Sequence, residues 1–188
     1  MATARFEITD TPLAGLKVIR RKPLEDARGF LCRFFCADEL ASIGFNKPVA
    51  QINHTLTRKA GAVRGLHFQY APTAEAKFIS CIKGEVYDVA VDIRQGSPTF
   101  LHWHAEVLAA DNYKSFFLPE GFAHGCQALT TDCEMLYLHS VKFAPETVGA
   151  LNVLDPKIAI KWPLEIAELS ERDRQHPFVN GDFKGVVS

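Results

Sequence analysis

Short apolar runs separated by glycine and proline dominate the middle of the chain, from residue 48 to about residue 163. The clearest example is KFISCIKGEVYDVAVDIR at residues 77–94, where two runs flank the turn pair Lys83-Gly84. In the second run, Val86, Asp88, Ala90 and Asp92 alternate with Tyr87, Val89, Val91 and Ile93. This is the period of a strand with one buried face. The pattern therefore predicts many short β-strands joined by tight turns.

Helical spacing is confined to two short segments. ADELASIGF, residues 37–45, has two acidic residues near its start and Gly44 as a stop, which predicts a short helix. EIAELSERDRQHPF, residues 165–178, predicts a second one, which Ser170 would cap and in whose first turn Asp173 would lie. DPKIAIKWPL, residues 155–164, predicts a short edge strand. We therefore expect residues 1–188 to form one all-β domain, a sandwich or barrel with a few short peripheral helices.

Composition narrows the class of partner. Of the 188 residues 47% are hydrophobic and 23% charged, which is ordinary for a soluble globular protein. The formal net charge of −1 gives no general attraction to nucleic acid or to an anionic membrane. We therefore expect neither as a partner, and an anionic ligand would need a local basic cluster.

The cysteines and the N-terminal segment bear on localisation. Five cysteines at irregular spacing form no zinc-binding pattern and read as reduced thiols, with a catalytic cysteine disfavoured. The N-terminal segment has no apolar core typical of a secretory signal, and no apolar run approaches 18 residues. These features predict a cytoplasmic protein.

The stretch RGLHFQ, residues 64–69, carries the first candidate chemistry. On a regular strand His67 and Gln69 share a face, and Arg64 points away unless the strand twists or bulges. An isolated histidine is most often a core residue with one hydrogen bond. Lys77 opens an apolar run, where an inward lysine needs a partner or a ligand, although it could also extend to water. Taken alone, neither residue identifies a site.

Three further residues complete a plausible set. His124 lies in a turn-like FAHG segment, Tyr137 fits a core tyrosine, and Asp173 fits the helix-capping role described above. Together with His67 and Lys77 they offer a base, a cation for a developing oxyanion and a phenol that returns a proton. The set therefore favours proton-transfer chemistry.

A metal-dependent enzyme is the alternative from a different class. His102 and His104 have the spacing of metal ligands and could act with His67 and His124. However, Trp103 alternates with the pair as the expected buried residue, so the two imidazoles read as solvent-facing. The motif around His67 also lacks the H-x-H with a following glutamate that such metal sites usually have. We therefore expect no metal site.

Eight motifs in order resemble one family, the nucleotide-sugar 3,5-epimerases typified by dTDP-4-dehydrorhamnose 3,5-epimerase. They are DARGF, QINHT, GAVRGLHFQ, KGEVYDVAVDIRQGSPTF, LPEGFAHGCQAL, MLY, DPKIAIKWP and LSERD. The resemblance implies a cupin-like jelly-roll fold, a homodimer, and no cofactor or metal. It implies epimerisation at C3, C5 or both of a nucleotide-diphosphate-linked 4-keto-6-deoxyhexose through an enolate.

The resemblance also implies roles for single residues. His67 matches the general base, Asp173 its partner, Lys77 the group that stabilises the enolate oxygen, and Tyr137 the acid on the opposite face. The implied substrate-contacting residues are Arg28, Phe30, Gln51, Asn53, Arg64, His124, Phe143 and Arg172. Of these, Arg28 and Phe30 are expected near the site of the partner subunit.

Three positions depart from the family pattern and leave the nucleotide open. Arg33 stands where a glutamate is usual, Phe143 replaces a tyrosine, and Val148 replaces a second glutamate. A CDP- or GDP-linked sugar and epimerisation at one carbon therefore remain as alternatives. A non-catalytic module that binds nucleotide sugars is the third hypothesis, and it predicts that His67→Ala leaves function intact.

Overall fold

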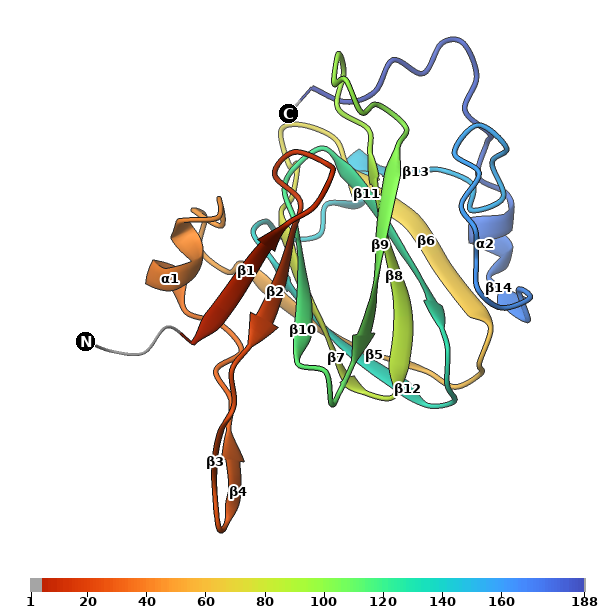
Figure 1. Cartoon of the computed structure of the whole chain (residues 1–188). Helices are drawn as coiled ribbons and strands as arrows, with labels where there is room; N and C mark the ends of the chain where they lie inside the picture. Colours follow the sequence, from red (N-terminus) through yellow and green to blue (C-terminus); the bar gives the residue numbers. More distant parts are fainter. Residues whose placement is uncertain (1–4, 188) are drawn as a thin grey trace.

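Two antiparallel β-sheets face each other in the computed structural model, which describes residues 5–187 (Figure 1). The order of the first sheet is β1 (Phe6–Asp10), β2 (Lys17–Arg21), β10 (Lys114–Leu118), β7 (Lys77–Lys83), β12 (Cys133–His139) and β5 (Gln51–Thr57). The order of the second is β13 (Val148–Ala150), β6 (Ala62–Gln69), β11 (Phe122–Ala128), β8 (Glu85–Asp92) and β9 (Trp103–Ala109). In addition, β14 (Glu168–Leu169) pairs in parallel with β6. The predicted all-β architecture is confirmed.

The remaining elements are short and lie around the two sheets. They are the hairpin strands β3 (Leu24–Asp26) and β4 (Gly29–Leu31), the helices α1 (Ala37–Ala41) and α2 (Glu171–Arg174), and the single 3-10 turn η1 (Pro145–Thr147). The β3–β4 hairpin projects away from the body of the molecule, whereas α2 lies beside β6 (Figure 1). Both predicted helices are confirmed. No helix within residues 5–187 is long and apolar enough to cross a membrane.

Alternation along the strands of the first sheet explains how both of its faces are covered. Phe116, Ile79 and Tyr137 are register partners across β10, β7 and β12, and they belong to the cluster between the sheets. Their sequence neighbours on the other face, among them Phe78, pack against the segment around α1. Burying each such large side chain contributes about 1.5–3 kcal/mol. The apolar period of two thus places the odd-numbered residues of β7 and β12 inside.

The expectation that β8 buries one face is wrong, because both of its faces are covered. Val86 and Ala90 belong to the cluster between the sheets, whereas Val89 and Val91 pack against an apolar segment that follows β13. The strand predicted at residues 155–164 belongs to this segment and is absent. Ile158 and its neighbours cover the outer face of the second sheet as irregular chain instead of pairing with it.

Candidate active site

A cavity of about 700 Å³ opens between the two sheets, beside the apolar cluster that fills the rest of the interior. It is lined by strands β5, β7 and β12 of the first sheet, by β6 and β11 of the second, and by α2. Ten of the twelve residues predicted from the sequence line it: Gln51, Asn53, Arg64, His67, Lys77, His124, Tyr137, Phe143, Arg172 and Asp173. Residues separated by more than 120 positions therefore meet in one place.

Arg64 and His67 both line the cavity because β6 is not a regular strand, which is the exception that the sequence left open. β6 and β11 pair His67 with His124 and Arg64 with Cys126, so β6 carries one more residue than β11 between these pairs. The extra residue forms a β-bulge at Gly65 and brings both side chains to the same side. A Cβ at Gly65 would lie 2.6 Å from the Cα of Gly125, and its φ of +116° also requires glycine.

His67 and Asp173 form a hydrogen-bonded pair on the wall made by β6 and α2. Nε2 of His67 lies 2.7 Å from Oδ1 of Asp173. Ser170 caps α2 by accepting a hydrogen bond of 3.0 Å from the backbone N–H of Asp173, as the sequence predicts. Burial alone would raise the pKa of Asp173, but the hydrogen bond and charge of His67, together with hydrogen bonds from Ser170 and Gly65, lower the pKa overall. Because Nε2 faces an ionised carboxylate, Nδ1 is the ring nitrogen left free to accept a proton.

Lys77 enters the cavity from the opposite sheet, and it is only 7% exposed. Its Nζ lies 3.0 Å from Oε1 of Glu75 and donates to the carbonyl oxygen of His67 at 3.3 Å. Oε2 of Glu75 lies 2.8 Å from Nδ1 of His139. Burial alone would raise the pKa of Glu75, but the charge of Lys77 and the contact with His139 lower it to about 2. Lys77 is therefore a buried ammonium held by an ionised carboxylate.

Tyr137 extends from β12 into the same cavity and is 9% exposed. Burial raises the pKa of its hydroxyl well above the ordinary value for tyrosine, so the phenol keeps its proton. Its ring lies at 5.8 Å from that of His124 in an edge-on contact, and Nε2 of His124 lies 2.8 Å from Oδ1 of the buried Asp88. The cavity thus has a histidine with a free ring nitrogen on one sheet and a protonated phenol on the other.

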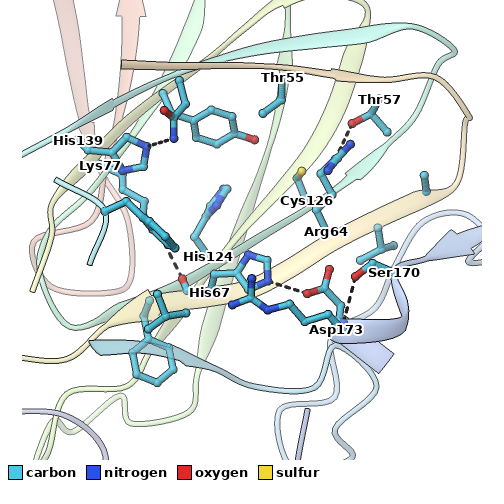
Figure 2. A pocket seen from close by; sticks show the side chains of 18 of the residues that line it. Thr55, Thr57, Arg64, His67, Lys77, His124, Cys126, His139, Ser170 and Asp173 are labelled. Carbon is cyan, nitrogen blue, oxygen red and sulfur yellow. Dashed lines mark hydrogen bonds and ion pairs between the residues drawn. The ribbon is translucent and has the colours of Figure 1, made fainter. Parts of the chain in front are cut away.

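Arginines line the cavity as well. Arg64 is anchored through Nε, which donates to Oγ1 of Thr57 at 2.9 Å (Figure 2). Arg58 and Arg172 line the same cavity. Guanidinium groups are well suited to bind phosphate oxygens, so this cluster supplies the local positive charge that an anionic ligand needs.

Arg28 and Phe30 do not line the cavity of this chain. Both lie in the projecting β3–β4 hairpin, where Nη2 of Arg28 pairs with Oδ2 of Asp26 at 2.6 Å. Phe30 is 60% exposed and touches Tyr113 edge-on, at 5.7 Å between ring centroids. The hairpin therefore carries both side chains away from the cavity of this chain.

The structure brings together only two histidines of the metal-dependent alternative, His67 and His124, and places His102 and His104 elsewhere. His104 lies in a separate depression beside Glu106 and Lys114, and His102 precedes β9 and is exposed. Trp103 is only partly buried, against the outer face of the second sheet. Among the described residues, His67 instead groups with Asp173 and His176, whose ligand atoms lie within 4.8 Å of one another.

Sequence reasoning missed Glu75 and His139, which both line the cavity. His139 follows Tyr137 by two residues on β12, and residues i and i+2 of a strand share a face, so the period of two could have identified it. Glu75 precedes β7 in irregular chain, where no period applies. Only the need of a buried lysine for a counter-ion pointed toward such a residue.

Comparisons with known proteins agree with this geometry. A sequence profile described as dTDP-4-dehydrorhamnose 3,5-epimerase matches residues 10–181. The chain is 35% identical over 175 residues to dTDP-4-dehydrorhamnose 3,5-epimerase of Salmonella typhimurium, which covers 92% of this chain and 95% of the relative.

Solved structures give the same result. The dTDP-6-deoxy-D-glucose-3,5-epimerase of Legionella pneumophila, in complex with dTDP-4-keto-L-rhamnose, superposes with a TM-score of 0.90 at 34% identity, covering 97% of this chain and 99% of that one. A 3'-monoepimerase of Streptomyces bikiniensis in complex with dTDP-quinovose superposes with a TM-score of 0.81 at 33% identity, covering 89% and 85%. The predicted cupin-like jelly-roll fold is confirmed. The chain belongs to the dTDP-4-dehydrorhamnose 3,5-epimerase family.

Proposed function

We propose that this protein is a cofactor-independent epimerase that inverts C3, C5 or both in a 4-keto-6-deoxyhexose linked to dTDP. One observation carries the proposal: a histidine with a free ring nitrogen and a protonated tyrosine lie on opposite sheets of one cavity, together with a buried ammonium. Family membership supports the same reaction. The whole chain, residues 1–188, would act as a single domain.

The first step is removal of a proton next to the 4-keto group. His67 accepts the proton at Nδ1, the C–H bond electrons move into the carbonyl, and an enolate forms. Asp173, 2.7 Å from Nε2, stabilises the imidazolium that results. Lys77 stabilises the negative charge on the enolate oxygen, and removing one preorganised group of this kind typically costs about 10²–10³ in rate.

The second step is return of a proton from the other side of the ring. Tyr137 donates its phenolic proton to the carbon, and the enolate electrons form the new C–H bond. Because Tyr137 lies on β12 and His67 on β6, the two proton transfers take place on opposite faces of a ring held between the sheets. Exchange with water then restores both side chains, so no redox cofactor is needed.

Binding of the nucleotide diphosphate falls to the remaining polar residues. Arg64 and Arg172 would hold the diphosphate through charge-assisted hydrogen bonds. Gln51, Asn53, His124 and Phe143 would contact the sugar and the base. We also propose a homodimer, in which the projecting hairpin with Arg28 and Phe30 reaches the cavity of the partner subunit.

The nucleotide and the inverted carbons form the finer part of the proposal. The relatives named above act on dTDP-linked sugars, which supports dTDP over CDP or GDP. Phe143 and Val148 line the cavity, so the two replacements of family residues at these positions affect which nucleotide the cavity can bind. Arg33 pairs with Glu39 and does not line the cavity of this chain.

Incubation in heavy water with 4-keto-6-deoxyhexoses linked to dTDP, CDP and GDP tests the proposal. Proton NMR is expected to show deuterium entering C3, C5 or both of the dTDP-linked sugar first. Exchange that is faster with the CDP- or GDP-linked sugar would replace the proposed nucleotide. Nucleotide-sugar binding without exchange for any of the three would favour a non-catalytic binding module and overturn the proposal.

A further inference from the structure

The two residues missed by sequence reasoning, Glu75 and His139, form one end of a continuous hydrogen-bond chain along the cavity wall. Its links run from the backbone N–H of Phe143 to Oε1 of Gln51 (3.0 Å) and from Nε2 of Gln51 to Oδ1 of Asn53 (3.0 Å). They continue from Nδ2 of Asn53 to Nε2 of His139 (3.3 Å) and from Nδ1 of His139 to Oε2 of Glu75 (2.8 Å). Glu75 then contacts Lys77.

The direction of donation along this chain follows from its first link. A backbone N–H can only donate, so Oε1 of Gln51 accepts, and the amide nitrogen of Gln51 donates to the oxygen of Asn53. The amide nitrogen of Asn53 must then donate to Nε2 of His139, which therefore carries no hydrogen. His139 is thus the neutral tautomer with its hydrogen on Nδ1, and it donates to Glu75.

Both carboxylate oxygens of Glu75 have a hydrogen-bond donor beside them. His139 occupies Oε2, and the ammonium of Lys77 lies against Oε1, with the Glu75 side chain only 10% exposed. Lys77 donates a second N–H to the carbonyl oxygen of His67, so one N–H remains for a ligand in the cavity. The direction of that last N–H is therefore set by Glu75, which is itself held in place by His139.

We infer that Glu75 and His139 are positioning residues for Lys77: they keep its ammonium charged and aim its free N–H at the substrate oxygen. This inference rests on the proposed function, in which Lys77 stabilises the enolate. The other titratable or charged side chains that line the cavity are Tyr137 on β12, His67 and Arg64 on β6, His124 and Cys126 on β11, Glu168 on β14, Arg172 and Asp173 on α2, and Arg58.

The chain offers a matched control elsewhere in the first sheet. Glu134 on β12 also joins a lysine and a histidine, because its oxygens lie 3.3 Å from Nζ of Lys83 and 2.9 Å from Nε2 of His54. This second cluster lies outside the cavity and is largely exposed. Glu75→Gln and Glu134→Gln thus each remove a carboxylate that joins a lysine to a histidine. Glu75→Gln does so inside the cavity and Glu134→Gln does so outside it.

Glu75→Gln is expected to lower kcat about 10–100-fold at pH 8, with the KM within about threefold of wild type. The alkaline limb of the pH profile should move to lower pH, since a buried ammonium without a counter-ion releases its proton more readily. Glu75→Asp, which keeps the charge, should recover part of the rate. Glu134→Gln should stay within about twofold of wild type.

Measurements that do not depend on catalysis test this inference separately from the proposed function. Acetic anhydride labelling of Lys77, followed by mass spectrometry with Lys83 as internal reference, should be at least about threefold faster in Glu75→Gln. Nitrogen-15 NMR should show His139 as the neutral tautomer protonated at Nδ1. The inference would be overturned if Glu75→Gln left both the labelling rate of Lys77 and the pH profile unchanged. If Glu75→Gln altered the labelling rate but the wild type did not exchange deuterium into any substrate, only the proposed function would be overturned.

Discussion

Replacing Asp173 by asparagine tests how strongly the base depends on its partner. The asparagine side chain could still accept a hydrogen bond from Nε2 of His67, but it carries no charge. At 2.7 Å and an effective dielectric constant of about 20, the attraction between imidazolium and carboxylate is about 6 kcal/mol. Because the His67 side chain is 39% exposed, solvent screening reduces this to about 3 kcal/mol. That energy corresponds to about a 100-fold lower kcat.

Steady-state kinetics of Asp173→Asn, with the dTDP-linked 4-keto sugar as substrate, measures this loss. The KM should change little, because the charge acts on the imidazolium that forms during the reaction and not on the bound substrate. Glu171→Gln in the same helix is the matched control, since Glu171 bonds only to the exposed Gln175. A loss below about threefold in Asp173→Asn would refute the reasoning.

Three further predictions concern other parts of the site. Tyr137→Phe should still exchange deuterium at the substrate carbon while inversion falls about 10²–10⁴-fold, as followed by NMR of the product, because only the returning acid is lost. Gly65→Ala should lower the free energy of unfolding by about 3 kcal/mol in urea, since its Cβ would lie 2.6 Å from backbone atoms of β11; an unchanged midpoint would contradict the need for glycine at the bulge. The pKa of Glu75 is lowered from 4.5 to about 2, so its contribution of about 3 kcal/mol is complete above pH 4.5 and is lost as the pH falls toward 2. Acid unfolding followed by circular dichroism should therefore show a steeper loss in wild type than in Glu75→Gln, and parallel curves would count against the buried ion pair.

The sequence predicted the class of fold because strand period and turn residues are local signals. Alternation in β7 and β12 places Lys77 and Tyr137 inside, and Ser170 caps α2 where the sequence predicted it. These local signals, together with the family resemblance, were enough to name ten residues that line one cavity.

What the sequence could not provide depends on contacts between distant segments. The relative direction of Arg64 and His67 depends on a bulge that only the pairing with β11 reveals. The second buried face of β8 depends on irregular chain that arrives more than 60 residues later. Glu75 meets His139 only when β7 and β12 lie side by side.

The role of His67 as the base is the central claim, and position-resolved deuterium exchange tests it most directly. Wild-type protein and His67→Asn are incubated with the dTDP-linked 4-keto-6-deoxyhexose in heavy water, and C3 and C5 are followed by NMR. The account predicts exchange by the wild type and at least about a 100-fold slower exchange by His67→Asn, with nucleotide binding retained. Exchange at the wild-type rate in His67→Asn would contradict it.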